Sequence, residues 1–97
     1  MMAPQELLAL AGRIESAKRS DNALDVQSEI ALFEATDLVL AIRSNDAGTK
    51  VIYTIKGGRD RTCWADDNTV NYLQRAKTAA RLRSLATSGS QHEGASS

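Results

Sequence analysis

The fold class is decided by the stretch VIYTIKGGRDRTCWA, residues 51–65. Its first five residues, VIYTI, are rich in the β-branched and aromatic side chains that favour strands. Gly57 and Gly58 follow closely, and adjacent glycines allow the positive φ angles that a two-residue hairpin turn needs. The stretch therefore predicts a β-hairpin whose second strand is residues 59–65, with Cys63 as a small buried apolar group.

Another strand precedes this hairpin. Residues 38–42, LVLAI, form a short apolar run, and residues 44–48, SNDAG, have the composition of a turn that closes two strands, with Gly48 available for a positive φ. Together the segments predict an antiparallel three-stranded meander. The nearly continuous apolar run 38–42 indicates a strand buried on both faces. The pattern leaves open whether helices cover one face of the sheet or both.

Three helices flank the meander. Residues 3–19 show apolar residues at helical spacing, with Pro4 in the first turn, where a helix tolerates proline. Residues 20–22, SDN, offer N-cap side chains for a second helix to about residue 35, and residues 66–69, DDNT, offer them for a third over 70–87. The stripes that we expect to be buried are Leu7, Leu10, Ile14 and Ala17 in the first helix, Ala23, Val26, Ile30 and Phe33 in the second, and Tyr72, Ala76, Ala79, Leu82 and Ala86 in the third, the last widened by Val70, Leu73, Ala80 and Leu85.

The order α-α-β-β-β-α predicts a small α+β domain over residues 1–87, with helices packed on the sheet. A chain of 97 residues is long enough for one core and too short for two. The polar segment SGSQHEGASS, residues 88–97, has no periodicity and predicts a disordered tail. The chain has no apolar run of membrane-spanning length and no signal-peptide pattern, so we expect a soluble, cytoplasmic protein without a membrane partner.

Parts of the helices resemble the small phage and prophage proteins described as a phage ABA sandwich domain. The matching segments are residues 10–17, LAGRIESA, and residues 23–31, ALDVQSEIA, which follow a short polar link, and residues 79–83, AARLR, at the end of the fold. The resemblance implies a sheet between helix layers and a prophage origin. It carries over no catalytic residue, because the family has no established chemistry.

Motifs of common chemistries are incomplete in this sequence. Neither a Walker pattern nor G-x-G-x-x-G occurs, so residues 56–62, KGGRDRT, are interpreted as a turn with solvated charges rather than as a phosphate site. Cys63 lacks a base, since His92, the single histidine, lies in the predicted tail. Asp66 and Asp67 are expected to cap the third helix rather than to bind a metal. We therefore expect no enzymatic activity, no cofactor and no metal.

The net charge is zero, but the charges are unevenly distributed along the chain. Residues 1–49 carry four basic and eight acidic side chains, and residues 50–97 carry eight basic and four acidic ones. Two outcomes are open: complementary patches that drive self-association or docking on a larger complex, or charges that interleave within the monomer. The first hypothesis for function is a non-enzymatic binding or accessory module of phage or prophage origin, with a protein partner or a second copy.

The alternative hypothesis is weak nucleic-acid binding through a basic hairpin and the last helix. It requires the basic residues to form one surface that neutralises several phosphates. Against it, the chain has few aromatic side chains to stack on bases, and the helical cations spread over a wide arc. The candidate nucleic-acid-binding residues are Lys56, Arg59, Arg61, Arg75, Lys77, Arg81 and Arg83.

Overall fold

The computed structural model describes the backbone of residues 2–96 and the side chains of residues 2–88. Its elements are α1 (Pro4–Ser16), α2 (Asn22–Leu32), β1 (Val39–Ser44), β2 (Lys50–Ile55), β3 (Arg59–Trp64) and α3 (Tyr72–Ser96). This order confirms the predicted α+β class. α3 runs to Ser96, so the third helix extends beyond its predicted end at residue 87. The predicted disorder of residues 88–97 stays a prediction.

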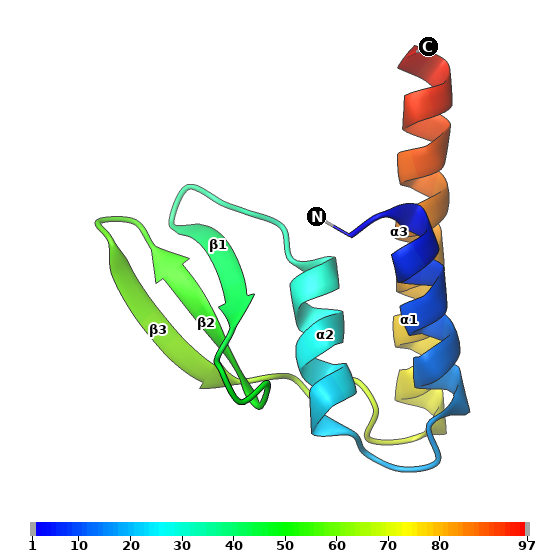
Figure 1. Cartoon of the computed structure of the whole chain (residues 1–97), viewed down its shortest axis with the longest axis horizontal. Helices are drawn as coiled ribbons and strands as arrows, with labels where there is room; N and C mark the ends of the chain where they lie inside the picture. Colours follow the sequence, from blue (N-terminus) through cyan, green and yellow to red (C-terminus); the bar gives the residue numbers. More distant parts are fainter. Residues whose placement is uncertain (1, 97) are drawn as a thin grey trace.

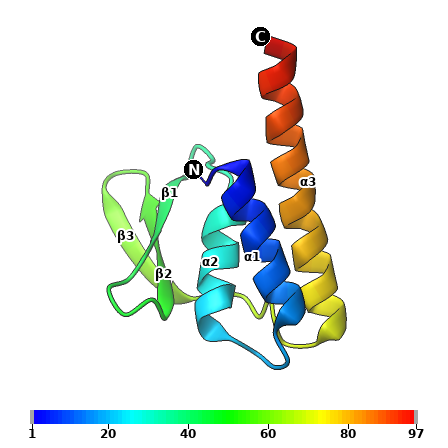
Figure 2. The ribbon, with the colours of Figure 1, turned by 45° about the vertical axis from the view of Figure 1, so that its right-hand side comes forward.

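The molecule has three layers, which Figures 1 and 2 show from two sides. The sheet forms one outer layer, α2 lies in the middle, and α1 and α3 form the other outer layer. The backbone of α2 packs against α1 and α3 and also against β1 and β2, whereas among the described residues neither α1 nor α3 packs its backbone against the sheet. Helices therefore cover one face of the sheet, while the phage-family resemblance implies a sheet between helix layers.

Capping contacts set the ends of the first two helices. In α1, Pro4 is the first helical residue, and the Glu6 carboxylate accepts a hydrogen bond from the Ala3 N–H at 3.3 Å. In α2, Asp21 is the N-cap, and its Oδ1 accepts from the Leu24 N–H at 3.1 Å. The predicted N-cap region of the second helix is confirmed, because the side-chain oxygen satisfies an N–H that has no partner inside the helix.

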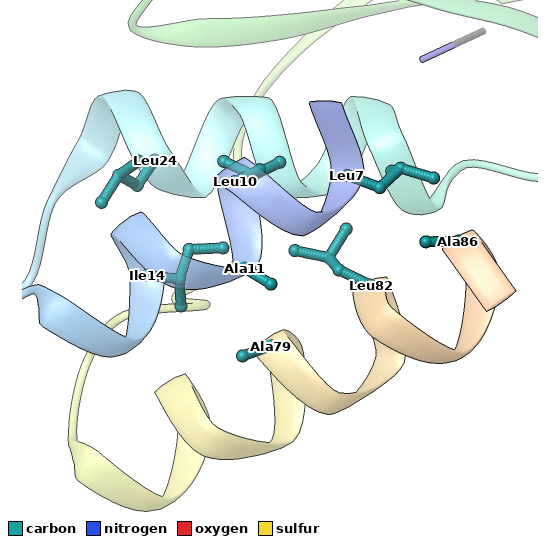
Figure 3. Close-up of a cluster of buried hydrophobic side chains, with 8 residues drawn as sticks. All are labelled: Leu7, Leu10, Ala11, Ile14, Leu24, Ala79, Leu82 and Ala86. Atoms are coloured by element: carbon teal, nitrogen blue, oxygen red, sulfur yellow. The ribbon is translucent and has the colours of Figure 1, made fainter. Parts of the chain in front are cut away.

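The main core lies between the three helices, and Figure 3 shows its side chains. It consists of Leu7, Leu10, Ala11 and Ile14 from α1, Leu24 from α2, and Ala79, Leu82 and Ala86 from α3. Most of the predicted α1 stripe is confirmed. The predicted α3 stripe is wrong at its start, because Tyr72 and Leu73 are 74% and 73% exposed. Its predicted widening is wrong throughout, because Val70, Ala80 and Leu85 are exposed as well. Leu73 lies nine residues before Leu82, which at about 100° per residue puts it on the opposite side of the helix.

Both sides of α2 pack against other elements, because the helix lies between two layers. Leu24 belongs to the helical core, whereas the Phe33 ring, just past the end of α2, packs against Tyr53 of β2 at a centroid distance of 6.3 Å. The predicted single stripe includes Val26, which is buried, and Ala23, which is exposed. It omits Leu24, because one stripe describes a helix that buries only one face.

The strand order β1-β2-β3, antiparallel throughout, confirms the predicted meander. Val51 of β2 is fully buried on the face toward α2. The prediction that residues 38–42 are buried on both faces is wrong, because Leu40 and Ala41 are exposed. Ala41 pairs with Thr54 on the outer face, which no described element covers, and Leu40 is left unpaired at a β-bulge. Cys63, opposite Val51 in the register, is only half-buried, because β3 is an edge strand.

The β2–β3 turn contains three residues, 56–58, between the paired Ile55 and Arg59. Gly57 and Gly58 have φ angles of +96° and +86°, and the Gly58 N–H donates to the Ile55 carbonyl at 3.1 Å. The positive φ angles are confirmed. The predicted two-residue length is wrong, because Lys56 is outside the strand register and belongs to the turn.

Candidate functional site

The seven candidate basic residues lie in two separate parts of the molecule. Three of them, at positions 56, 59 and 61, are on the β2–β3 hairpin, and the other four are on α3. In Figure 1, α2 lies between the hairpin and α3. The seven residues therefore come from separate elements, and their contact with nucleic acid stays a prediction.

Two of the four cations on α3 are engaged within the molecule. Arg83 pairs with the Glu15 carboxylate of α1, which lowers the pKa of Glu15 and raises that of Arg83. Arg75 donates from Nη1 to the Thr69 carbonyl at 3.1 Å. Its Nε is buried and has no hydrogen-bond partner among the described residues. Lys77 and Arg81 are exposed.

The charges of the two halves interleave in the folded chain. The two ion pairs among the described side chains, Glu15–Arg83 and Arg43–Asp60, each join residues 1–49 to residues 50–97. The second pair crosses the outer face of the sheet at 2.8 Å, and Arg43 also donates to the Thr54 hydroxyl at 3.3 Å. Hydrogen bonding to Arg43 lowers the pKa of Asp60. In these contacts, acidic and basic side chains from the two halves of the sequence pair within the monomer.

The segment between β3 and α3 is anchored by a buried polar cluster that no local sequence pattern indicated. Thr69 is fully buried, and its hydroxyl donates to Asp25 Oδ1 at 2.9 Å and accepts from the Asp21 N–H at 2.7 Å. Burial raises the pKa of Asp25, and the hydrogen bonds from Thr69 oppose that rise in part. The cluster ties the start of α2 to the segment that leads into α3.

The same segment corrects the predicted cap of α3. Asn71, and not residues 66–69, caps the helix, because its Oδ1 accepts from the Gln74 N–H at 2.8 Å. Asn68 faces inward instead, and its Oδ1 and carbonyl oxygens accept from the Thr78 hydroxyl at 3.3 and 3.4 Å. Asp66 and Asp67 lie before the helix in the connecting segment.

A cleft of about 230 Å³ opens where α2, β2, the connecting segment and α3 meet. In its lining, the Glu29 carboxylate accepts from the Tyr53 hydroxyl at 3.2 Å and from the Asp66 N–H at 3.1 Å. Burial raises the pKa of Glu29, and burial together with the Glu29 charge raises the pKa of Tyr53 to about 12. The lining residues are Glu29, Leu32, Phe33, Tyr53, Asp66, Asn68 and Arg81.

The cleft contains residues that sequence patterns did not single out as a site. Among the seven candidate cations, Arg81 is the one that lines it. Glu29 and Tyr53 come from separate elements, 24 positions apart, and carry no motif. The signal in the sequence was only indirect: Glu29 lies one turn from Phe33, on the side of α2 that faces the sheet.

Large apolar side chains are exposed at the start of α3. Val70, Tyr72 and Leu73, here called the α3 apolar cluster, are 50%, 74% and 73% exposed. Exposed charges flank this cluster along the chain, with Asp67 before it and Lys77 after it. Other exposed apolar side chains lie elsewhere, at Leu38 and Leu40 beside β1 and at Trp64 at the end of β3.

Comparison with family models, with curated proteins and with solved structures finds no match. Within the described residues, no three His, Cys, Asp or Glu side chains are placed to hold a metal ion. No helix in that part of the chain is both long and apolar enough to cross a membrane. Function is therefore inferred from the cleft and the surfaces described above.

Proposed function

We propose that the protein is a small non-enzymatic binding module that docks through the α3 apolar cluster onto a second copy of the chain. The observation that carries the proposal is the exposure of Val70, Tyr72 and Leu73, all within four consecutive residues. Contiguous exposed apolar side chains mark interaction sites, because covering them removes apolar surface from water. Tyrosine is also enriched in the centres of protein interfaces.

The charges beside the cluster support a second copy as the partner. Lys77 follows Leu73 by one helical turn, and the exposed Asp67 precedes the cluster along the chain, so the surface carries both signs of charge, as pairing between two identical copies requires. The net charge of the chain is zero, so no long-range repulsion opposes association.

The proposal includes a cytoplasmic location and a phage or prophage origin. The single cysteine, Cys63, is free, which fits a reducing compartment. The origin is supported by the resemblance of residues 10–17, 23–31 and 79–83 to the phage family.

Sedimentation equilibrium over a wide range of protein concentration tests the proposal. We expect the wild type to dimerise reversibly and the double variant Tyr72→Ser/Leu73→Ser to remain monomeric. The control is Leu38→Ser/Leu40→Ser, which removes exposed apolar surface beside β1 and should still dimerise. A wild type that stays monomeric at the highest concentration contradicts the proposal, as does a Tyr72→Ser/Leu73→Ser variant that dimerises unchanged.

Nucleic-acid binding by the hairpin is a second candidate, favoured by one observation. Lys56, Arg59 and Arg61 lie within six residues, and none of them forms an ion pair among the described side chains. Three phosphate contacts give a slope of roughly −2 to −3 in a plot of log K against log salt. A titration of ¹⁵N-labelled protein with mixed-sequence DNA and RNA should shift the amides of residues 56–61 at low salt. An absence of shifts at low salt rules this candidate out.

A further inference from the structure

The cleft beside Glu29 has an acidic wall that is already fixed in position. Each oxygen of the Glu29 carboxylate accepts a hydrogen bond from a different element, one from Tyr53 of β2 and one from the Asp66 N–H. Because an ionised carboxylate offers about four acceptor positions, two remain for a ligand. Asp66 itself lines the same cleft. Such a wall suits a donor that carries positive charge, because carboxylates are hydrogen-bond acceptors with negative charge. The Glu29 side chain is already held in place, so little of its conformational entropy remains to be lost on binding.

The opposite charge on the cleft comes from α3. Arg81 lines the cleft, yet it takes part in neither of the two ion pairs among the described side chains. Its guanidinium therefore forms no ion pair with Glu29 or Asp66. A guanidinium presents paired N–H groups that match a carboxylate, so it suits a negatively charged group. The cleft thus offers separate positions for a cation and an anion.

Volume and apolar lining narrow the class of ligand. A volume of about 230 Å³ lies below the range of drug-sized sites, about 300–1,000 Å³, so the cleft suits a small ligand. Leu32 and Phe33 give the cleft an apolar wall beside its charged groups.

We propose that this cleft binds a small zwitterion, an α-amino acid with an apolar side chain. Its ammonium group lies against Glu29 and Asp66, its carboxylate against Arg81, and its side chain against Leu32 and Phe33. This site is independent of the proposed self-association, since none of its lining residues belongs to the α3 apolar cluster.

Three probes that share the leucine side chain separate the two charges of the ligand. ¹⁵N-labelled protein is titrated with L-leucine, with L-leucinamide, which lacks the carboxylate, and with N-acetyl-L-leucine, which lacks the ammonium. We expect leucine to shift the amides near Glu29, Tyr53, Asp66 and Arg81. Each of the other two probes should bind at least about tenfold more weakly than leucine. No shift with leucine at tens of millimolar overturns the proposal, as does equal binding of leucine and N-acetyl-leucine.

Two variants assign the charges to their residues. Arg81→Gln should reduce leucine affinity to that of leucinamide, and Glu29→Gln should abolish the advantage of leucine over N-acetyl-leucine. The matched control is Lys77→Gln, which removes one positive charge from the same helix outside the cleft and should bind leucine as the wild type does. Because Arg81 is exposed, its variant stays folded even if Glu29→Gln does not. An Arg81→Gln protein that binds leucine as tightly as Lys77→Gln contradicts the assignment.

Discussion

The two sides of α2 are held to their neighbours by different means. Toward α1 and α3, eight buried apolar side chains form one continuous cluster (Figure 3). Toward the sheet, Val26 and Val51 are buried outside that cluster. The Glu29 carboxylate then links α2 to Tyr53 and to the Asp66 N–H by hydrogen bonds. The helical side therefore depends on apolar burial, and the sheet side on a few apolar contacts with polar links between elements.

This difference bears on how the molecule opens. Regions with few buried apolar contacts and accessible hydrogen bonds open at lower free energy than the core. The sheet has one face in water and is covered by α2 alone. We therefore expect the strands to exchange their amide hydrogens faster than α1 and the described part of α3. The Glu29 cleft lies at this boundary, so opening of the sheet also opens the cleft.

The largest effect is expected from a truncation on the helical side. Leu82 is fully buried in the core, so Leu82→Ala should lower the free energy of unfolding by about 2–5 kcal/mol. The loss combines the transfer of the side chain with the cavity that it leaves. Urea denaturation followed by circular dichroism measures it. Leu38→Ala, at a position 66% exposed, is the control and should stay within about 0.5 kcal/mol of the wild type.

A truncation on the sheet side should have a smaller and more local effect. Val51→Ala removes two methyl groups from a fully buried position and should cost about 2 kcal/mol. Hydrogen exchange read by NMR should show reduced protection in β1, β2 and β3, while amides of α1 keep theirs. An equal loss of protection in α1 and in the sheet would show one cooperative unit and remove the distinction between the two sides.

The polar cluster between α2 and the connecting segment gives a pH-dependent prediction. Burial raises the pKa of Asp25 above the unfolded value of 3.8. At pH values just above 3.8, the folded state therefore binds more protons than the unfolded state. This carboxyl therefore contributes stability at low pH that is lost as pH rises through its folded pKa. Asp25→Asn keeps an acceptor for Thr69 and removes the titration, with a change of about 1 kcal/mol or less at acid pH.

The measurement for Asp25→Asn is a series of urea denaturations between pH 4 and pH 7. Relative to the wild type, the variant should become more stable as pH rises across this range. Glu29→Gln provides the comparison on the sheet side, since burial raises the pKa of Glu29 as well. A difference between Asp25→Asn and wild type that does not change with pH would mean that the carboxyl titrates alike in the folded and unfolded states.

Much of the fold could be predicted from the sequence, because each confirmed element depends on local signals. The α1 stripe repeats at helical spacing because α1 buries one face, and Gly57 and Gly58 allowed a turn with positive φ. The prediction failed where tertiary contacts decide the outcome. The single predicted stripe omits Leu24 because α2 is buried on two faces, and the predicted burial of residues 38–42 on both faces fails because the outer face of the sheet is open.

The candidate site was less predictable than the fold. Thr69 contacts Asp25 across 44 positions of sequence, so its assignment as part of a helix cap followed from local pattern alone and was wrong. The cleft residues come from four separate segments and share no motif. Only the packing of α2 against the sheet brings Glu29 to Tyr53, and a single sequence contains no direct record of that packing.

Two glycine substitutions compare the two sides directly. Gly12 lies inside α1, where an added Cβ meets nothing within 4 Å, so Gly12→Ala should stabilise the protein by about 1 kcal/mol through helix propensity. Gly58 has a φ of +86°, so Gly58→Ala should destabilise it by about 1 kcal/mol, because an L side chain is strained there. Urea denaturation at low protein concentration measures both. A loss of stability in Gly12→Ala would show that this face of α1 packs against another surface, and the helical side would then carry a contact beyond its own core.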